Sequence, residues 1–294
     1  MKQHNGAIPL NRLHRWFHRK LRSKLPQTAA GLQPFNWAVG YDVRDTIGAV
    51  TIKNQGGNDS CGGQAGSYFT EIQRRLNKIT EGAISAKSIY SPIAYPGGGT
   101  TVPSLETQLG LNGANLEDVV PSYDIYGNPL TEALIASTAW RTPALTTDAL
   151  TRAGSTPYDI ASDINSIAAA IEAYGAVILE ITAYANPTWV TAYPVFNPYN
   201  SKTGKFSHFL CACGAKTING QQYLIILESE GVAQGDQGIQ YLNQAFFTAG
   251  GVVDSFTMIA DSHIVALPPN LSWWTQFLGF FHTLFAGLTG KQKV

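Results

Sequence analysis

The chain has 294 residues, of which 44% are hydrophobic and 14% are charged. This composition supports a sizeable buried core and excludes general disorder, and the length allows one two-lobed domain or two small ones. Basic and acidic residues both number 20, which excludes a globally basic nucleic-acid binder.

Residues 1–38 are interpreted as a basic N-terminal extension. Over residues 9–25, leucine and phenylalanine recur at helical spacing, and arginine and lysine occupy the remaining face. The pattern fits an arm that binds an anionic surface, a helix packed across the domain, or a solvated extension. The basic segment is not followed by an apolar core and a small-residue cleavage site, so we expect no secretory signal peptide.

A compact region is expected over residues 39–267, with lobes at about 39–150 and 151–267. In the first lobe, Asp59 or Ser60 can cap a helix that begins at Cys61 and buries one face. Residues 121–160 are rich in proline, threonine, serine and aspartate. This composition predicts a long irregular connection between the lobes.

The second lobe is expected to be rich in strands. Ser162 can cap a helix that ends near Gly175, and an alternating strand follows it. Further apolar strands are expected over residues 208–214 and 223–227, separated by a turn at 219–220. A helical first lobe and a β-rich second lobe predict an α+β architecture with a cleft between them.

The cysteines favour a reducing environment. There are only three, so they do not form a disulfide scaffold. Cys211 and Cys213 lie two apart on an expected strand, which is not zinc-knuckle spacing, and we interpret both as core filling. We therefore expect a location in the cytoplasm, or on a particle or membrane, and no metal site.

Residues 268–294 form a hydrophobic tail. Aromatic and aliphatic side chains over residues 271–288 would cover most of a helix surface. The segment is short for a membrane span and contains Gln276 and His282. It fits an interfacial helix, a helix that docks on a protein partner, or one that packs on its own domain.

Cys61 and His208 are the candidate reactive pair. A cysteine at a helix N-terminus is exposed to the positive end of the helix dipole, which favours the thiolate. A nucleophilic thiol needs a base, and His208 begins an apolar strand where it would face the cleft. A lone cysteine and a lone histidine are usually structural, so this pair needs further support.

That support comes from an ordered series of motifs. Residues 42–69 read DVRDTIGAVTIKNQGGNDSCGGQAGSYF and resemble the entry motif of the papain-like cysteine peptidase family. The gap from Gln55 to Cys61 equals the family's gap from its oxyanion glutamine to its nucleophile. Further similarities follow in the family's order through about residue 265. The resemblance implies a two-lobed papain-like fold with a helical first lobe and a β-barrel-like second lobe.

The resemblance also implies acyl transfer to a cysteine, with a peptide or protein as substrate. The Cys61 thiolate would attack a peptide carbonyl while the His208 imidazolium protonates the leaving amine. The Cys61 backbone N–H and the Gln55 amide would stabilise the oxyanion. Gly98 and Gly99, in a glycine-rich loop, and Ser207, before the histidine, are the expected substrate contacts. No cofactor and no metal are implied.

The sequence departs from the family at several positions. Glu228 occupies the place of the asparagine that orients the histidine. A carboxylate can accept the imidazole N–H, so we hypothesise a Cys61–His208–Glu228 triad. The alternative is that Glu228 points to solvent and nothing orients His208. Glu230 replaces a shielding tryptophan, which predicts a wetter site.

Three further departures concern the surroundings of the nucleophile and the N-terminal extension. Gly62 stands where the family has a tryptophan, and Asn58 replaces a cysteine that usually forms a disulfide. Residues 1–37 are too short for the family's full inhibitory propeptide.

An active peptidase is the leading interpretation of the sequence. The alternative is a catalytically silent papain-like module in a larger assembly, such as a phage particle or a membrane complex. A third class is a membrane-attached adaptor that binds lipid through residues 273–288.

Overall fold

The computed structural model describes residues 6–8, 10, 14, 33–184, 187–195 and 205–260. The chain divides into two compact units, Met1–Ala260 and Asp261–Val294, and the second lies outside the described residues. The expected tail helix and most of the expected basic helix at 9–25 also lie outside them. The proposed boundaries near residues 38 and 267 remain predictions. None of the helices in the described ranges has the length and apolar character to cross a membrane.

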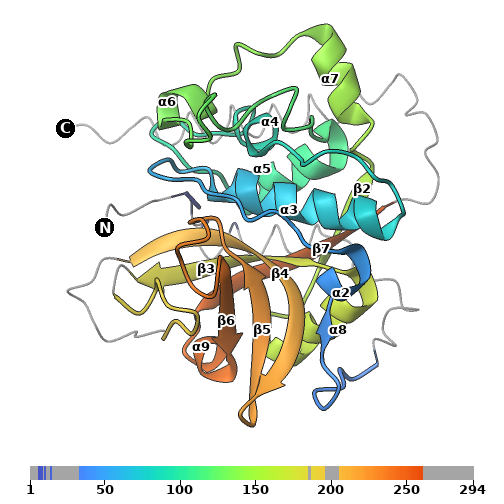
Figure 1. Ribbon diagram of the computed structural model, residues 1–294, viewed down its shortest axis with the longest axis vertical. Coiled ribbons are helices and arrows are strands. Elements are labelled where there is room, and N and C mark those ends of the chain that lie inside the picture. Colours follow the sequence, from blue (N-terminus) through green and yellow to red (C-terminus); the bar gives the residue numbers. More distant parts are fainter. Residues whose placement is uncertain are drawn as a thin grey trace. The chain divides into compact units, whose positions relative to one another are not determined.

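One lobe of the first unit consists of helices and is called the helical lobe (Figure 1). It comprises α3 (Cys61–Leu76), α4 (Ala86–Tyr90), α5 (Val102–Thr107), the π-helix η1 (Gln108–Asn112), α6 (Glu132–Ile135) and α7 (Pro143–Leu150). The long helix α3 is buried from its first residue through Ile72 and lies next to the other lobe. The short helix α2 (Arg44–Ile47) precedes it in the chain.

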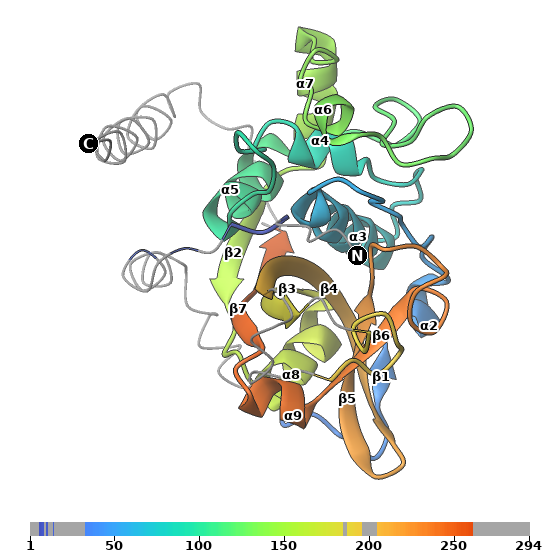
Figure 2. The same ribbon diagram turned by 90° about the vertical axis from the view of Figure 1, so that its left-hand side faces the viewer.

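The other lobe, called the sheet lobe, contains a seven-stranded sheet in the order β2-β7-β3-β4-β5-β6, with β1 paired to β4. Its strands are β1 (Tyr41–Asp42), β2 (Ser155–Asp159), β3 (Val177–Tyr184), β4 (Lys205–Ile218), β5 (Gln221–Leu227), β6 (Ile239–Asn243) and β7 (Val252–Ala260). Every pairing is antiparallel. Figure 2 shows the strands curving around α8 (Ile164–Tyr174), with α9 (Gln244–Thr248) below. The predicted two-lobed α+β architecture is confirmed.

The sheet is buried on both faces because side chains of β4 alternate between two cores. Phe209, Cys211 and Cys213 pack in the core that contains α3, whereas Leu210 and Ala212 pack in the core that contains α8. Both cysteines are free and fully buried, as core filling requires. Burial is the main cause that raises the pKa of Cys213 to about 12, so this thiol stays neutral.

Two predictions about the segment before β3 are wrong. The cap of α8 is Asp163 rather than Ser162, and its carboxylate accepts the N–H groups of Asn165 and Ser166. Residues 121–160 are not one irregular connection, because they contain α6, α7 and β2. Threonine and proline also begin helices: the Thr142 hydroxyl caps α7 and Pro143 occupies its first position.

Helix α3 approaches its neighbours closely because it begins with two glycines after Cys61. A Cβ on Gly63 would lie 2.6 Å from the carbonyl oxygen of Ala86 and 2.7 Å from the Cβ of Tyr90. A Cβ on Gly62 would overlap the Cγ2 atom of Thr100. Thr100 therefore occupies the space beside the residue that is a tryptophan in the family.

We predict that Gly63→Val destabilises the chain by roughly 1–3 kcal/mol, because the new side chain would force α3 away from α4. Urea-induced unfolding measures the change. The matched control is Gly82→Val, since a Cβ at Gly82 meets no atom within 4 Å, and it should change stability by less than about 0.5 kcal/mol. Equal effects of the two substitutions would contradict this account of α3 packing.

Candidate active site

Cys61 is the first residue of α3 and faces the sheet lobe. Ser60 is the cap residue by position, but its side chain makes no capping hydrogen bond. The Cys61 side chain is completely buried, and its Sγ accepts the backbone N–H of Phe209 at 3.4 Å. This hydrogen bond ties the start of α3 to β4, directly beside His208.

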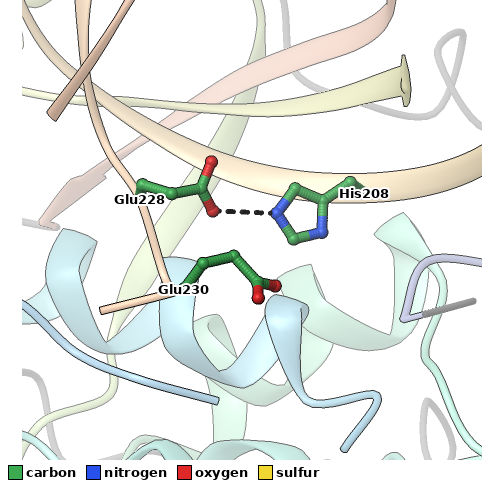
Figure 3. Close-up of side chains that lie close together, drawn as sticks. All are labelled: His208, Glu228 and Glu230. Atoms are coloured by element: carbon green, nitrogen blue, oxygen red, sulfur yellow. Dashed lines mark hydrogen bonds and ion pairs between the residues drawn. The ribbon is translucent and has the colours of Figure 1, made fainter. Parts of the chain in front are cut away.

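His208 and Glu228 form a buried pair (Figure 3). His208 lies on β4, and Glu228 follows the last residue of β5. The Nε2 atom of His208 is 3.1 Å from Oε1 of Glu228, and the two residues are 1% and 0% exposed. The same Oε1 accepts the backbone N–H of Ser229 at 2.8 Å. The structure therefore does not place Glu228 in solvent.

The protonated form of His208 is favoured. Burial is the largest single influence and by itself lowers the pKa of His208. Interactions with the nearby Cys61 and with Glu228 oppose burial, and the net result raises the pKa well above its usual value. The imidazolium therefore persists to higher pH than that of an ordinary histidine.

Aromatic rings lie against His208, and both members of the pair are buried, contrary to the predicted wetter site. Trp189 and Phe206 contact the His208 ring edge-on, with centroids 6.1 Å and 6.0 Å away. Trp189 lies in the segment between β3 and β4. The His208 ring is therefore covered by a tryptophan from a different part of the chain than position 230, where the family has its shielding tryptophan. No sequence signal pointed to it, because only the folded sheet brings this segment to His208.

Glu230 is a second carboxylate beside the pair, and Figure 3 shows it next to the His208 ring. Burial is the main cause that raises the pKa of Glu230 to about 7, and the charge of Glu228 adds to it while His208 opposes it. Ligand atoms of His208, Glu228 and Glu230 all lie within 4.8 Å of one another, a spacing that a metal ion could bridge. The hydrogen bond between His208 and Glu228 already occupies one possible metal-ligand atom on each residue, Nε2 of His208 and Oε1 of Glu228.

Gln55 is held in one orientation by Ser229. The Ser229 hydroxyl donates to Gln55 Oε1 at 2.7 Å, and the Gln55 backbone N–H donates to the Ser229 carbonyl at 2.6 Å. Because Oε1 of Gln55 accepts a hydrogen bond from this hydroxyl, the other terminal atom of the amide is Nε2, which carries two N–H donors. Nε2 donates one hydrogen to the carbonyl of Asn58 at 3.1 Å, which leaves its second hydrogen for another acceptor.

Tyr68 connects the nucleophile helix to Glu228. Its hydroxyl accepts the backbone N–H of Lys53 at 2.5 Å and donates to the carbonyl of Glu228 at 2.9 Å. Helix α3 therefore supplies both Cys61 and an anchor for the chain at Glu228. The sequence indicated only that Tyr68 lies on the buried face of this helix.

Asn58 replaces the family's disulfide with hydrogen bonds. Its amide donates to the carbonyl of Leu130 at 2.8 Å, and its Oδ1 accepts the N–H of Ser60 at 3.1 Å. These bonds hold the loop before Cys61 in place without a covalent cross-link.

The expected substrate contacts lie on both sides of Cys61. Gly98 and Gly99 adopt positive φ angles of 96° and 82°, and Gly99 donates its N–H to the Tyr90 hydroxyl at 2.7 Å. Ser207 lies on β4 directly before His208. A cavity of about 220 Å³ is lined by Tyr193, Tyr223 and Tyr241 among others, and by none of the candidate catalytic residues. Cys61 and His208 are 0% and 1% exposed, so the expected cleft is not open at Cys61.

The comparisons with known proteins show the fold. No protein-family model and no curated protein sequence matches the chain. Among solved structures, xylellain, a cysteine protease from Xylella fastidiosa, has a TM-score of 0.70 and 15% identity, covering 88% of this chain and 97% of that one. Bromelain from Ananas comosus has a TM-score of 0.56 and 17% identity, covering 76% of this chain and 99% of that one.

A ragweed pollen allergen, the Amb a 11 cysteine protease in its proform, has a TM-score of 0.64 and 17% identity, covering 91% of this chain and 71% of that one. The chain therefore has the two-lobed fold of the papain-like cysteine peptidases. At these identities the likeness concerns the fold, and the chemistry of the site is argued from its own residues.

We predict that Glu228→Gln lowers the pKa of His208, because it removes a negative charge that stabilises the imidazolium. Titration of the His208 ring by NMR measures the shift directly and needs no activity. Asp118→Asn removes an exposed charge of the same sign and should leave the His208 pKa unchanged. An unchanged pKa in Glu228→Gln would show that the carboxylate does not support the imidazolium.

Proposed function

We propose that this chain is a cysteine peptidase that hydrolyses peptide bonds through Cys61 and His208. One observation carries the proposal: in a papain-like fold, a buried His208–Glu228 pair lies beside the sulfur at the start of α3. A buried charged pair costs free energy unless its partners compensate, so its retention beside a thiol favours a catalytic role.

Acylation uses the thiolate and the imidazolium together. The Cys61 sulfur attacks the substrate carbonyl carbon, and the carbonyl electrons move to oxygen. When the tetrahedral species collapses, the C–N bond breaks and His208 gives its proton to the leaving amine. Glu228 accepts the other ring N–H at 3.1 Å, which keeps the imidazole in one tautomer and stabilises its charged form.

The oxyanion is stabilised by two donors on the helical lobe. The backbone N–H of Cys61 lies at the start of α3, where the helix dipole also favours negative charge. The second donor is the remaining N–H of Gln55 Nε2, whose amide is already fixed by Ser229. Donors that are oriented before the reaction need no reorganisation when charge develops.

Deacylation repeats the chemistry with water. Neutral His208 takes a proton from the attacking water, whose oxygen adds to the thioester carbon. Collapse breaks the C–S bond, releases the carboxylic acid and regenerates the thiolate–imidazolium pair. The substrate is a peptide or a protein, because the backbone groups around Gly98, Gly99 and Ser207 suit an extended chain.

A catalytically silent papain-like module is the second candidate. It is favoured by the complete burial of Cys61 and His208, which no substrate can reach in this arrangement. A role on a particle, in the cytoplasm or on a membrane stays a proposal. So do binding of an anionic surface by residues 9–25 and of a membrane or a protein partner by residues 271–288.

We predict that Cys61→Ala abolishes both peptide hydrolysis and labelling by a thiol-directed activity probe, because it removes the nucleophile. Gln55→Ala should lower kcat/KM by about 100- to 1000-fold while labelling persists, because it removes one oxyanion donor. Peptide hydrolysis by the unmodified chain is the reference. Hydrolysis that survives in Cys61→Ala would exclude this mechanism.

We also predict that Ser229→Ala lowers kcat/KM by about tenfold, because one hydrogen bond no longer orients the Gln55 amide. The test is a double-mutant cycle. In the Gln55→Ala background, Ser229→Ala should cause little further loss, since the donor that it positions is gone. Independent, multiplicative losses would assign Ser229 a role unrelated to Gln55.

A further inference from the structure

Two carboxylates lie beside His208, and both come from the segment that follows β5. Glu228 and Glu230 are two residues apart, and Figure 3 shows both side chains extending toward the His208 ring. The residue between them, Ser229, instead donates its hydroxyl to Gln55. One ligand atom from each of His208, Glu228 and Glu230 lies within 4.8 Å of the other two. These three residues are called the His–Glu–Glu cluster.

The His–Glu–Glu cluster carries more negative than positive charge. When His208 is protonated, two carboxylates face one imidazolium. In the described part of the chain, no lysine or arginine forms an ion pair with either glutamate, and the Glu230 carboxylate accepts no hydrogen bond. Oε2 of Glu228 is buried and also has no hydrogen-bond partner among these residues. A buried carboxylate oxygen without a partner costs free energy, and a cation bound beside it would offset that cost.

The chemistry of the three side chains suits a zinc ion. Zinc binds imidazole nitrogen and carboxylate oxygen, and a site with three protein ligands keeps a fourth position for water. Calcium and magnesium prefer larger shells made of oxygen ligands, which one imidazole and two carboxylates do not supply. Ligand atoms around a tetrahedral zinc ion lie about 3.3 Å apart. The cluster reaches that spacing by rotation of the carboxylates, whose terminal torsions are soft.

Glu230 connects the cluster to solvent. His208 and Glu228 are buried, whereas Glu230 is partly exposed, so a metal ion can approach from the Glu230 side. The two glutamates occupy positions where the papain-like family has asparagine and tryptophan, neither of which supplies a carboxylate. The cluster is therefore particular to this chain. The sequence predicted no metal site because that prediction considered the spacing of cysteines, and this cluster contains none.

We propose that the His–Glu–Glu cluster binds a zinc ion, and that bound zinc withdraws His208 from acid–base chemistry. The metal takes the Nε2 atom that now bonds to Glu228, and the proton on Nε2 passes to solvent. His208 is then a neutral metal ligand rather than the imidazolium that protonates the leaving amine. The metal site does not depend on the proposed peptidase function, whereas the loss of activity rests on it.

The first experiment measures the zinc affinity of the reduced, metal-free chain by competition with a chromogenic chelator. We expect one zinc ion per chain. Glu230→Gln should weaken binding by about tenfold or more, because it removes a charged ligand and keeps the shape of the side chain. The matched control Glu172→Gln removes the same charge from an exposed position on α8 and should leave the affinity unchanged. Absence of zinc binding, or equal affinities in Glu230→Gln and the unmodified chain, overturns the site.

A second experiment identifies the ligands and does not depend on the folding of Glu230→Gln. Cys61→Ala should bind zinc as tightly as the unmodified chain, because the thiol is not part of the cluster. The unmodified chain loaded with cobalt(II) should show no thiolate-to-metal charge-transfer absorption. Loss of zinc binding in Cys61→Ala, or a thiolate band in the cobalt-loaded chain, would place the metal on the sulfur and refute the proposal.

Peptide hydrolysis tests the consequence separately. Saturating zinc should lower kcat/KM of the unmodified chain by about 100-fold or more, because the general acid is lost, and a chelator should restore it. Magnesium at the same concentration should have no effect. Activity that persists with the zinc site filled would contradict the withdrawal of His208. Zinc binding that depends on Glu230, without hydrolysis by the metal-free chain, would leave the metal site standing and refute the peptidase function instead.

Discussion

The contact between the start of α3 and strand β4 determines where every reactive group of the site lies. The hydrogen bond from the Phe209 N–H to the Cys61 sulfur places the proposed nucleophile beside His208. Glycines at positions 62 and 63 allow this approach, because any side chain there would meet Thr100 or the backbone of α4. The likeness to xylellain and bromelain reflects this arrangement of lobes rather than shared sequence.

Around that contact, a buried hydrogen-bond network joins the His208–Glu228 pair to the Gln55 amide, the proposed oxyanion donor. Glu228 accepts from His208 and from the Ser229 N–H, while the Ser229 hydroxyl fixes Gln55. Tyr68 holds the same stretch from the helical lobe. In a low-dielectric interior, a carboxylate stabilises imidazolium more strongly than an amide can, so a glutamate suits the position beside His208.

The same burial explains why the site is closed. Trp189 and Phe206 lie against the His208 ring from one direction. Gly6 lies beside the sulfur from another, and the residues that follow it donate backbone hydrogen bonds to Thr100 and Ser207.

The sequence by itself determined the helix that begins at Cys61, the helix before β3 and the strand-rich second lobe, together with the candidates Gln55, Cys61, His208 and Glu228. Periodicity and motif spacing report on neighbours in the chain: Cys61 begins α3, Glu228 follows the last residue of β5, and Gln55 is found by its spacing from Cys61. Only the tertiary structure decided that Ser229, Trp189 and Gly6 belong to the site. Each of these residues reaches the site through a contact between segments that are distant in the chain. A local sequence pattern predicts that a residue is buried, but it does not predict which distant segment packs against that residue.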